Sequence, residues 1–230
     1  MTSPSASPLA GATIVFDLDG TLVETAPDLG GPLNVLLQRE GIAILPLAEA
    51  RDMIGQGARA LISRGFAAAG APLSDAHLSR LFDDFIGHYR AHIADESRPF
   101  PGLLQALDTL AAEGAILSVC TNKRTDLSLA LLDVLGMTQR FAAVVGGDAV
   151  PAQKPAAVHL LTAIERAGGD PVRAVMVGDS TSDAGAARAA GTSLVLVSFG
   201  YTDIPAAELG ADVLIDHFNE LVPACRRLLT

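Results

Sequence analysis

From residue 103 to the C-terminus, short apolar runs alternate with segments of helical periodicity, and this alternation is the strongest constraint on the fold. Helices are expected at "LLQALDTLAAEG" and "TDLSLALLDVLG", and strands at "AILSVCT", "FAAVVGG" and "RAVMVGD". A further strand, "GATIVFD", is expected near the N-terminus. Because these strands are apolar almost throughout, both faces of their sheet must be covered. The pattern therefore predicts an α/β fold, a parallel sheet with helices on both faces.

Residues 24–98 break this alternation and carry apolar residues at three- and four-residue intervals. Gly and Pro separate the stretches, which predicts a block of helices after the first strand. The expected organisation is a Rossmann-like α/β core, made of residues 11–23 and 99–230, with an inserted all-helical cap domain at 24–98. Residues 1–10 are polar and rich in Ser and Pro, so we expect a disordered tail there.

The composition argues against several classes of protein. A formal net charge of -10 does not suit binding to nucleic acid, and no run approaches the roughly 18 apolar residues of a membrane-spanning helix. The N-terminus does not resemble a signal peptide, so a cytoplasmic location is expected. Cys120 and Cys225 provide neither a disulfide framework nor metal-site spacing. We expect no nucleic-acid or membrane partner, and a monomer or a homodimer.

Polar residues lie where the expected strands end. They are Asp17, Asp19, Thr121, Asn122, Lys154, Asp179 and Asp183. Ligands of open α/β sheets bind at the carboxyl ends of the strands, so these residues are expected to converge on one site. The helical block begins just after the first strand and is expected to cover this edge as a cap.

Several carboxylates in one site are tolerated only around a cation or with raised pKa values. The four acids offer oxygen ligands alone, so Mg²⁺ suits them better than zinc. His88 and His92 share a helix face without a third ligand, and His159 is expected to be structural. A phosphate could be held by the Thr121 hydroxyl, the Lys154 charge and backbone N–H groups at Gly20.

Asp17 and Asp19 are two residues apart, so an extended strand directs both toward one face. One carboxylate can attack phosphorus to form an aspartyl-phosphate, while the other protonates the leaving oxygen and later accepts a proton from water. Each motif alone has an ordinary explanation, such as turn chemistry at "DG" or helix capping at "GDSTSD". Their joint occurrence in order, each at a strand end, favours catalysis.

Four ordered motifs, "DLDGT", a strand ending in "TN", "KP" and "GDSTSD", resemble those of the haloacid dehalogenase-like phosphatases. The resemblance extends from about residue 11 to the C-terminus. It implies that Asp17 is the nucleophile and a metal ligand. It also implies that Asp19 is the general acid/base, with its backbone carbonyl on the metal. Thr121 and Lys154 would then hold the phosphoryl group.

The same resemblance implies roles for the remaining residues. Asp179 would bind Mg²⁺, and Asp183 would support the metal shell or orient Lys154. Gly20 and Asn122 are expected beside the substrate.

Within the family, "DLDGTLVETAPDL", "MIGQGARALI" and "HYRAHIADESRPFPG" are most similar to the phosphoglycolate phosphatases. The substrate of that group is a small phosphate ester with one further carboxylate. Arg59, in "GQGAR", is a candidate partner for this carboxylate. A solvated position on a helix is the alternative for Arg59.

Other functions of this fold require different residues. A dehalogenase does not need Asp19, and a phosphonoacetaldehyde hydrolase needs a cap lysine, whereas Lys123 and Lys154 are the only lysines. A non-catalytic relative should lack one of the key residues, and a nucleotide-binding Rossmann domain should carry a glycine-rich turn. A sugar-phosphate mutase, or a phosphatase of pyrophosphate or a sugar phosphate, remains open. The expected function is Mg²⁺-dependent hydrolysis of a small phosphorylated metabolite, 2-phosphoglycolate first.

Overall fold

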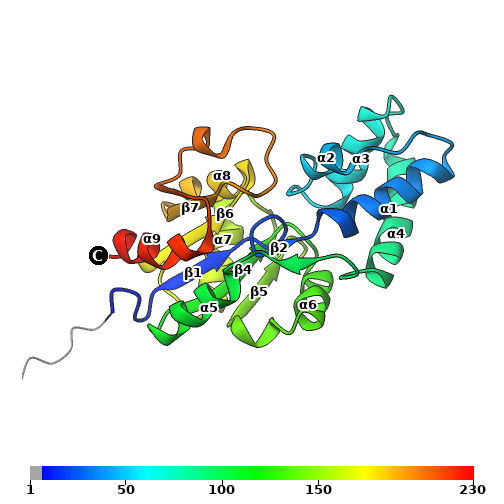
Figure 1. The fold of residues 1–230 in the computed structure, drawn as a ribbon. Helices are drawn as coiled ribbons and strands as arrows, with labels where there is room; N and C mark the ends of the chain where they lie inside the picture. The colour runs from blue at the N-terminus through cyan, green and yellow to red at the C-terminus, as the bar shows by residue number, and fades with distance from the viewer. Residues whose placement is uncertain (1–6) are drawn as a thin grey trace, which may run out of the picture.

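The computed structural model describes residues 7–230 of the chain, and a six-stranded parallel sheet lies at its centre (Figure 1). The strands are β1 (Thr13–Phe16), β4 (Ile116–Thr121), β5 (Ala143–Gly146), β6 (Ala174–Gly178), β7 (Ser193–Val197) and β8 (Val213–Ile215). Their order across the sheet is β5-β4-β1-β6-β7-β8. The predicted parallel α/β core is confirmed.

Strand β1 lies between β4 and β6, with Val15 beside Ser118 on one side and Met176 on the other. From β1 the chain builds β4 and β5 on one side, then crosses to build β6, β7 and β8 on the other. The direction of winding therefore reverses at β1. The carboxyl end of β1 is the switch point at which open α/β sheets bind ligands.

Helices cover both faces of the sheet because successive residues of β1 point to opposite sides. Val15 belongs to one buried cluster together with residues of α7 and α8, whereas Ile14 and Phe16 belong to a second cluster together with residues of α5, α6 and α9. These helices are α5 (Leu103–Ala112), α6 (Thr125–Val134), α7 (Ala157–Arg166), α8 (Thr181–Ala190) and α9 (Leu221–Leu228). Burial on both faces explains why β1 is apolar throughout.

A block of four helices, here called the insert, separates β2 (Val23–Glu24) from β3 (Arg98–Pro99). Its helices are α1 (Ala26–Arg39), α2 (Leu47–Arg51), α3 (Ala58–Ala68) and α4 (Asp75–Ala91). β2 and β3 pair as an antiparallel ribbon, so the chain leaves and re-enters the core at one point. The insert lies beyond the carboxyl ends of the sheet strands (Figure 1). Within residues 7–230, no helix is both long enough and apolar enough to cross a membrane.

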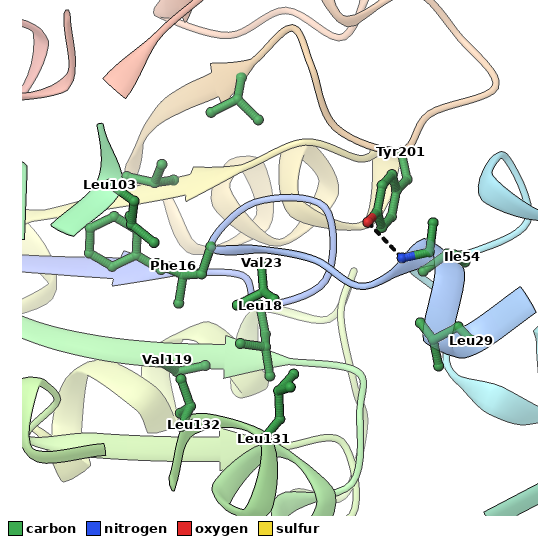
Figure 2. Packing of buried hydrophobic residues seen from close by; sticks show 14 of the residues in the cluster. Phe16, Leu18, Val23, Leu29, Ile54, Leu103, Val119, Leu131, Leu132 and Tyr201 are labelled. Carbon is green, nitrogen blue, oxygen red and sulfur yellow. Dashed lines mark hydrogen bonds between the residues drawn. The ribbon is translucent and has the colours of Figure 1, made fainter. Parts of the chain in front are cut away.

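Apolar and charged contacts join the insert to the core. The buried cluster that contains Phe16 of β1 also contains Leu29 and Ile54 of the insert (Figure 2). At the surface, Arg90 of α4 forms an ion pair with Asp126 of α6. The insert is therefore closed against the core, and a continuous apolar core connects the two parts.

The segment before β1 departs from the sequence expectation. The expected tail covers residues 1–10, of which 1–6 lie outside the described residues. From residue 7 onward disorder is not found, because Leu9 is fully buried and Ser7 Oγ donates a hydrogen bond to Glu113 Oε2 at 2.7 Å. One apolar side chain anchors this segment, and a composition averaged over ten residues does not reveal it.

Candidate active site

The site is centred on Asp17, which follows β1 directly. Lys154, in the loop after β5, lies with its Nζ 2.9 Å from Asp17 Oδ1 and 2.6 Å from Asp183 Oδ1. The side chains of Lys154 and Asp183 are completely buried, and that of Asp17 is nearly so. One buried cation is thus held between two buried carboxylates.

Three acids form a compact group at this point. One carboxylate oxygen from each of Asp17, Asp179 and Asp183 lies within 4.8 Å of the others. Burial raises the pKa of Asp17 to about 7 although Lys154 opposes the shift, and burial together with the other two acids raises the pKa of Asp179 well above its usual range. Lys154 alone leaves this group with surplus negative charge, so its oxygen donors fit a hard divalent cation.

The two oxygens of Asp183 are already engaged. Oδ1 faces Lys154, and Oδ2 accepts hydrogen bonds from the backbone N–H of Asp179 at 3.1 Å, the backbone N–H of Ser180 at 3.0 Å and the Ser180 hydroxyl at 2.7 Å. Asp183 therefore orients Lys154 and the loop that follows β6. This geometry suits a supporting role better than direct binding of a metal.

Gly20 permits a close approach that no other residue would allow. Its φ is +83°, and a Cβ at this position would lie 2.4 Å from Asp179 Oδ2 and 2.7 Å from the ring of Tyr201. The backbone N–H of Tyr201 donates to the same Asp179 oxygen at 2.5 Å. The Tyr201 hydroxyl accepts from the N–H groups of Thr25 at 2.7 Å and Ala26 at 3.0 Å. Tyr201 thus connects Asp179 to the start of the insert.

Asp19 has different neighbours from Asp17. Its two carboxylate oxygens accept hydrogen bonds from Lys123 Nζ at 3.0 and 3.1 Å, and Oδ1 also accepts from Thr25 Oγ1 at 2.8 Å. The Asp19 side chain is not part of the compact group of three acids. Its expected contact with a metal rested on its backbone carbonyl alone, and its carboxylate is held by Lys123 and Thr25.

The sequence motifs assign no role to Lys123. Burial alone would lower its pKa, but the charge of Asp19 and the neighbouring Tyr89 raise the pKa above its ordinary value. Both lysines of the chain therefore pair with acids of "DLDGT", Lys154 with Asp17 and Lys123 with Asp19. The scarcity of lysine and the place of Lys123 directly after "TN" were the available signals.

Thr121 and Asn122 lie at the end of β4, as expected. Thr121 Oγ1 accepts a hydrogen bond from the backbone N–H of Lys123 at 3.2 Å. Asn122 Nδ2 donates to the backbone carbonyl of Lys154 at 3.2 Å and to that of Gly55 in the insert at 3.1 Å. Asn122 therefore joins the Lys154 loop to the insert at the edge of the site.

A cavity of about 310 Å³ opens between the core and the insert. Its core side includes Asp17, Asp19, Thr121, Asn122 and Lys123, and its insert side includes Arg59, Phe82 and Tyr89. Pockets for small molecules typically measure roughly 300–1,000 Å³, so this one is near the lower limit. It suits a small ligand that reaches both acids after β1.

Arg59 is an exposed residue of α3 at the insert side of the cavity. Its Nη2 donates to Ser79 Oγ at 3.0 Å, and its guanidinium carbon lies 5.3 Å from the ring centre of Phe82. Among residues 7–230, no carboxylate pairs with it at salt-bridge distance. Its charge is thus free to attract an anion entering the cavity.

His159 of α7 holds the Lys154 loop. Its Nδ1 accepts a hydrogen bond from the backbone N–H of Lys154 at 3.1 Å, and its Nε2 lies 3.0 Å from the carbonyl oxygen of Val145 on β5. Burial, together with the charge of Lys154, lowers the pKa of His159 to about 4. The neutral ring therefore carries its proton on Nε2 and donates to Val145, so its structural role is to fix the backbone that presents Lys154.

A sheet with its switch point at β1, a buried acid there and a buried lysine opposite are the features that point to a class of hydrolase. The family profile described as haloacid dehalogenase-like hydrolase matches residues 14–197. The chain belongs to this family.

Individual relatives are similar over almost the whole chain. A phosphoglycolate phosphatase of Caulobacter vibrioides is 54% identical over 222 residues, covering 96% of this chain and 94% of the relative. The crystal structure of a predicted phosphoglycolate phosphatase from Haemophilus somnus superposes with a TM-score of 0.85 at 29% identity, covering 96% of this chain and 99% of that one. CbbY from Rhodobacter sphaeroides, crystallised in complex with phosphate, has a TM-score of 0.76 at 26% identity, with coverage of 91% and 96%.

Proposed function

We propose that this hydrolase is an Mg²⁺-dependent phosphatase that cleaves 2-phosphoglycolate to glycolate and phosphate. The observation that carries the proposal is the setting of Asp17, a buried carboxylate that lines the cavity with Lys154 Nζ 2.9 Å away. The 54% identity with a phosphoglycolate phosphatase supports the choice of substrate. The phosphate bound to CbbY supports phosphate recognition by a related structure.

In the first step, a carboxylate oxygen of Asp17 attacks phosphorus, the bond to the ester oxygen breaks and an aspartyl-phosphate forms. Lys154 and the Thr121 hydroxyl donate to the phosphoryl oxygens and stabilise the charge that develops there. Mg²⁺, held by Asp17, Asp179 and the backbone carbonyl of Asp19, would neutralise part of that charge. Residues of the core alone hold Lys154 beside Asp17, the group that attacks.

Asp19 acts as the general acid and then as the general base. It gives a proton to the ester oxygen as glycolate leaves, and its carboxylate then accepts a proton from the water that attacks the aspartyl-phosphate. That attack releases phosphate and restores Asp17. Gly20 and Asn122 complete the loops around the phosphoryl group.

The size and charge of the cavity favour a small anionic substrate. A volume of about 310 Å³ suits 2-phosphoglycolate better than a sugar phosphate. Arg59, which has no carboxylate partner in the described residues, would attract the anion toward the cavity. A cytoplasmic location and a monomeric or homodimeric state stay predictions from the sequence.

Phosphate release from a panel of substrates tests the proposal. 2-Phosphoglycolate, pyrophosphate, glucose 6-phosphate and phosphoserine are compared by kcat/KM with Mg²⁺, and again after EDTA. The highest value for 2-phosphoglycolate, lost with EDTA and restored by Mg²⁺, supports it. A higher value for another ester overturns the substrate assignment, and no hydrolysis of any ester overturns the phosphatase assignment.

A further inference from the structure

A second charged cluster lies where the core meets the insert. Lys123 Nζ pairs with both oxygens of Asp19 and lies 4.5 Å from the ring centre of Tyr89 on α4. All three residues line the cavity and are more than nine-tenths buried, with exposed fractions of 7%, 8% and 1% for Lys123, Asp19 and Tyr89. The Tyr89 hydroxyl makes no well-aligned hydrogen bond among the described residues, although the neighbouring Lys123 ammonium opposes the rise of its pKa. The cluster therefore contains a buried polar group that is still unsatisfied.

Two groups in this cluster could bind a ligand: the ammonium of Lys123, which is a cation, and the hydroxyl of Tyr89, which is a hydrogen-bond donor. Burial raises the pKa of Tyr89 to about 12, so the hydroxyl keeps its proton at neutral pH. The ammonium of Lys123 has three N–H donors, which can pass from the carboxylate of Asp19 to another carboxylate. A charged ammonium beside a free phenol hydroxyl suits an anionic acceptor, and a carboxylate is the simplest one.

The bonding of 2-phosphoglycolate brings its carboxylate to this cluster. A single methylene carbon separates the ester oxygen from the carboxylate, and Asp19 must reach that ester oxygen to protonate it. The carboxylate must therefore lie beside Asp19, and Lys123 is the cation in contact with Asp19. Arg59 instead contacts Ser79 and Phe82 within the insert.

We propose that Lys123 and Tyr89 bind the carboxylate of the substrate, and that this binding breaks the ion pair between Lys123 and Asp19. The inference rests on the proposed function. Before substrate binds, Lys123 holds both oxygens of Asp19, the group that must protonate the ester oxygen. A substrate carboxylate competes for the same ammonium and frees the Asp19 side chain, which takes a proton from solvent and passes it to the ester oxygen. Recognition of the correct substrate is thereby coupled to availability of the acid.

The test compares 2-phosphoglycolate with ethyl phosphate, in which a methyl group replaces the carboxylate. The wild-type enzyme with Mg²⁺ is expected to prefer 2-phosphoglycolate in kcat/KM by roughly 10- to 100-fold, the usual value of a charged hydrogen bond. Lys123→Met should abolish most of this preference, because kcat/KM should fall much further for 2-phosphoglycolate than for ethyl phosphate. Arg59→Gln is the matched control and should lower both values while most of the preference for 2-phosphoglycolate stays.

The outcomes separate the two proposals. If the wild type does not hydrolyse 2-phosphoglycolate, the proposed function fails and the inference fails with it. If it does, and the Lys123→Met enzyme keeps the preference, the inference alone is overturned. Thermal unfolding checks that the variant is folded, and Lys123→Gln replaces it if it is not. Equal use of both esters by the wild type overturns the inference without any variant.

Discussion

The two lysine–aspartate pairs after β1 differ in what surrounds them. Lys154 and Asp17 lie wholly within the core, where Asp183 occupies the other side of the ammonium and leaves Lys154 no exposed surface. Lys123 and Asp19 lie at the boundary with the insert and line the cavity. Core residues alone surround the Lys154–Asp17 pair, whereas Tyr89 of the insert packs against the Lys123–Asp19 pair.

This difference assigns the two pairs to different tasks. A cluster built from core residues keeps its geometry whatever the insert does, which suits chemistry at phosphorus that is common to all phosphate esters. A cluster that is shared with the insert is completed only when the insert closes, which suits recognition of the part of the substrate that varies. Substitutions in the core pair should therefore affect all substrates alike, and those in the boundary pair should change specificity.

The largest expected effect is that of Asp17→Asn in the core pair. An amide is no nucleophile toward phosphorus, so Mg²⁺-dependent phosphate release should fall to the background of the assay for every ester. Circular dichroism and thermal unfolding should show a folded protein, since the substitution removes a carboxylate whose burial is unfavourable. Turnover within tenfold of the wild type would contradict the assignment of Asp17 as nucleophile.

Asp19→Asn should have the next largest effect. Loss of the proton donor should lower kcat for 2-phosphoglycolate by roughly 10²–10⁴-fold. The loss should be much smaller for p-nitrophenyl phosphate, because nitrophenolate leaves without a proton. Steady-state kinetics on the two substrates checks this, and an equal loss on both would mean that Asp19 does not act as the acid.

His159→Gln tests whether the ring that holds the Lys154 loop in the core is buried in its neutral form. Unfolded histidine binds a proton near pH 6.5, but folded His159 does so only near pH 4, so stability is full above pH 6.5 and falls as the pH drops toward 4. The wild type should lose about 2 kcal/mol more than the variant between pH 7 and pH 5. Urea unfolding of both proteins at the two pH values measures the difference. Parallel losses in the two proteins would contradict the neutral, buried ring.

The sequence predicted most of the fold because its signals are local and repeated. Each core strand is an apolar run that ends at a polar residue, and each connecting helix has its own periodicity. The ribbon of Val23–Glu24 and Arg98–Pro99 gave no such signal, because two residues cannot display a period. The five residues of Leu47–Arg51 are equally short for the 3.6-residue pattern.

The residues of the candidate site also fall into two groups, those with a local sequence signal and those without one. Asp17, Thr121 and Lys154 could be placed from the sequence, because strand ends are readable and parallel strands end at one edge. Lys123 had only indirect signals, its rarity and its place after "TN", and Tyr201 had none, because their roles depend on contacts between distant segments. Lys123 meets Asp19 across 104 residues, and the backbone N–H of Tyr201 meets Asp179 across 22.

The smallest expected effect is that of Tyr89→Phe, which removes only the unpartnered hydroxyl at the boundary pair. Stability should stay the same or rise by up to about 1 kcal/mol, because no protein hydrogen bond is lost and a buried unsatisfied group disappears. Tyr201, the other tyrosine of the chain, is the matched control. Its hydroxyl serves two backbone N–H groups and donates to Glu24 Oε1 at 2.6 Å, so Tyr201→Phe should cost about 1–3 kcal/mol.

The two tyrosine variants should also differ in activity. Tyr89→Phe, which has little effect on stability, should weaken the preference for a substrate carboxylate, whereas Tyr201→Phe, which lowers stability, should not change that preference. Tyr89→Phe should lower kcat/KM for 2-phosphoglycolate roughly 10-fold, the lower end of the value of a hydrogen bond to a charged group, and should affect ethyl phosphate much less. Tyr201→Phe should treat the two esters alike, because its hydroxyl contacts the chain and not the cavity. If Tyr89→Phe instead lowered stability and left the preference for the carboxylate intact, the hydroxyl would serve packing, and recognition would rest on Lys123 alone.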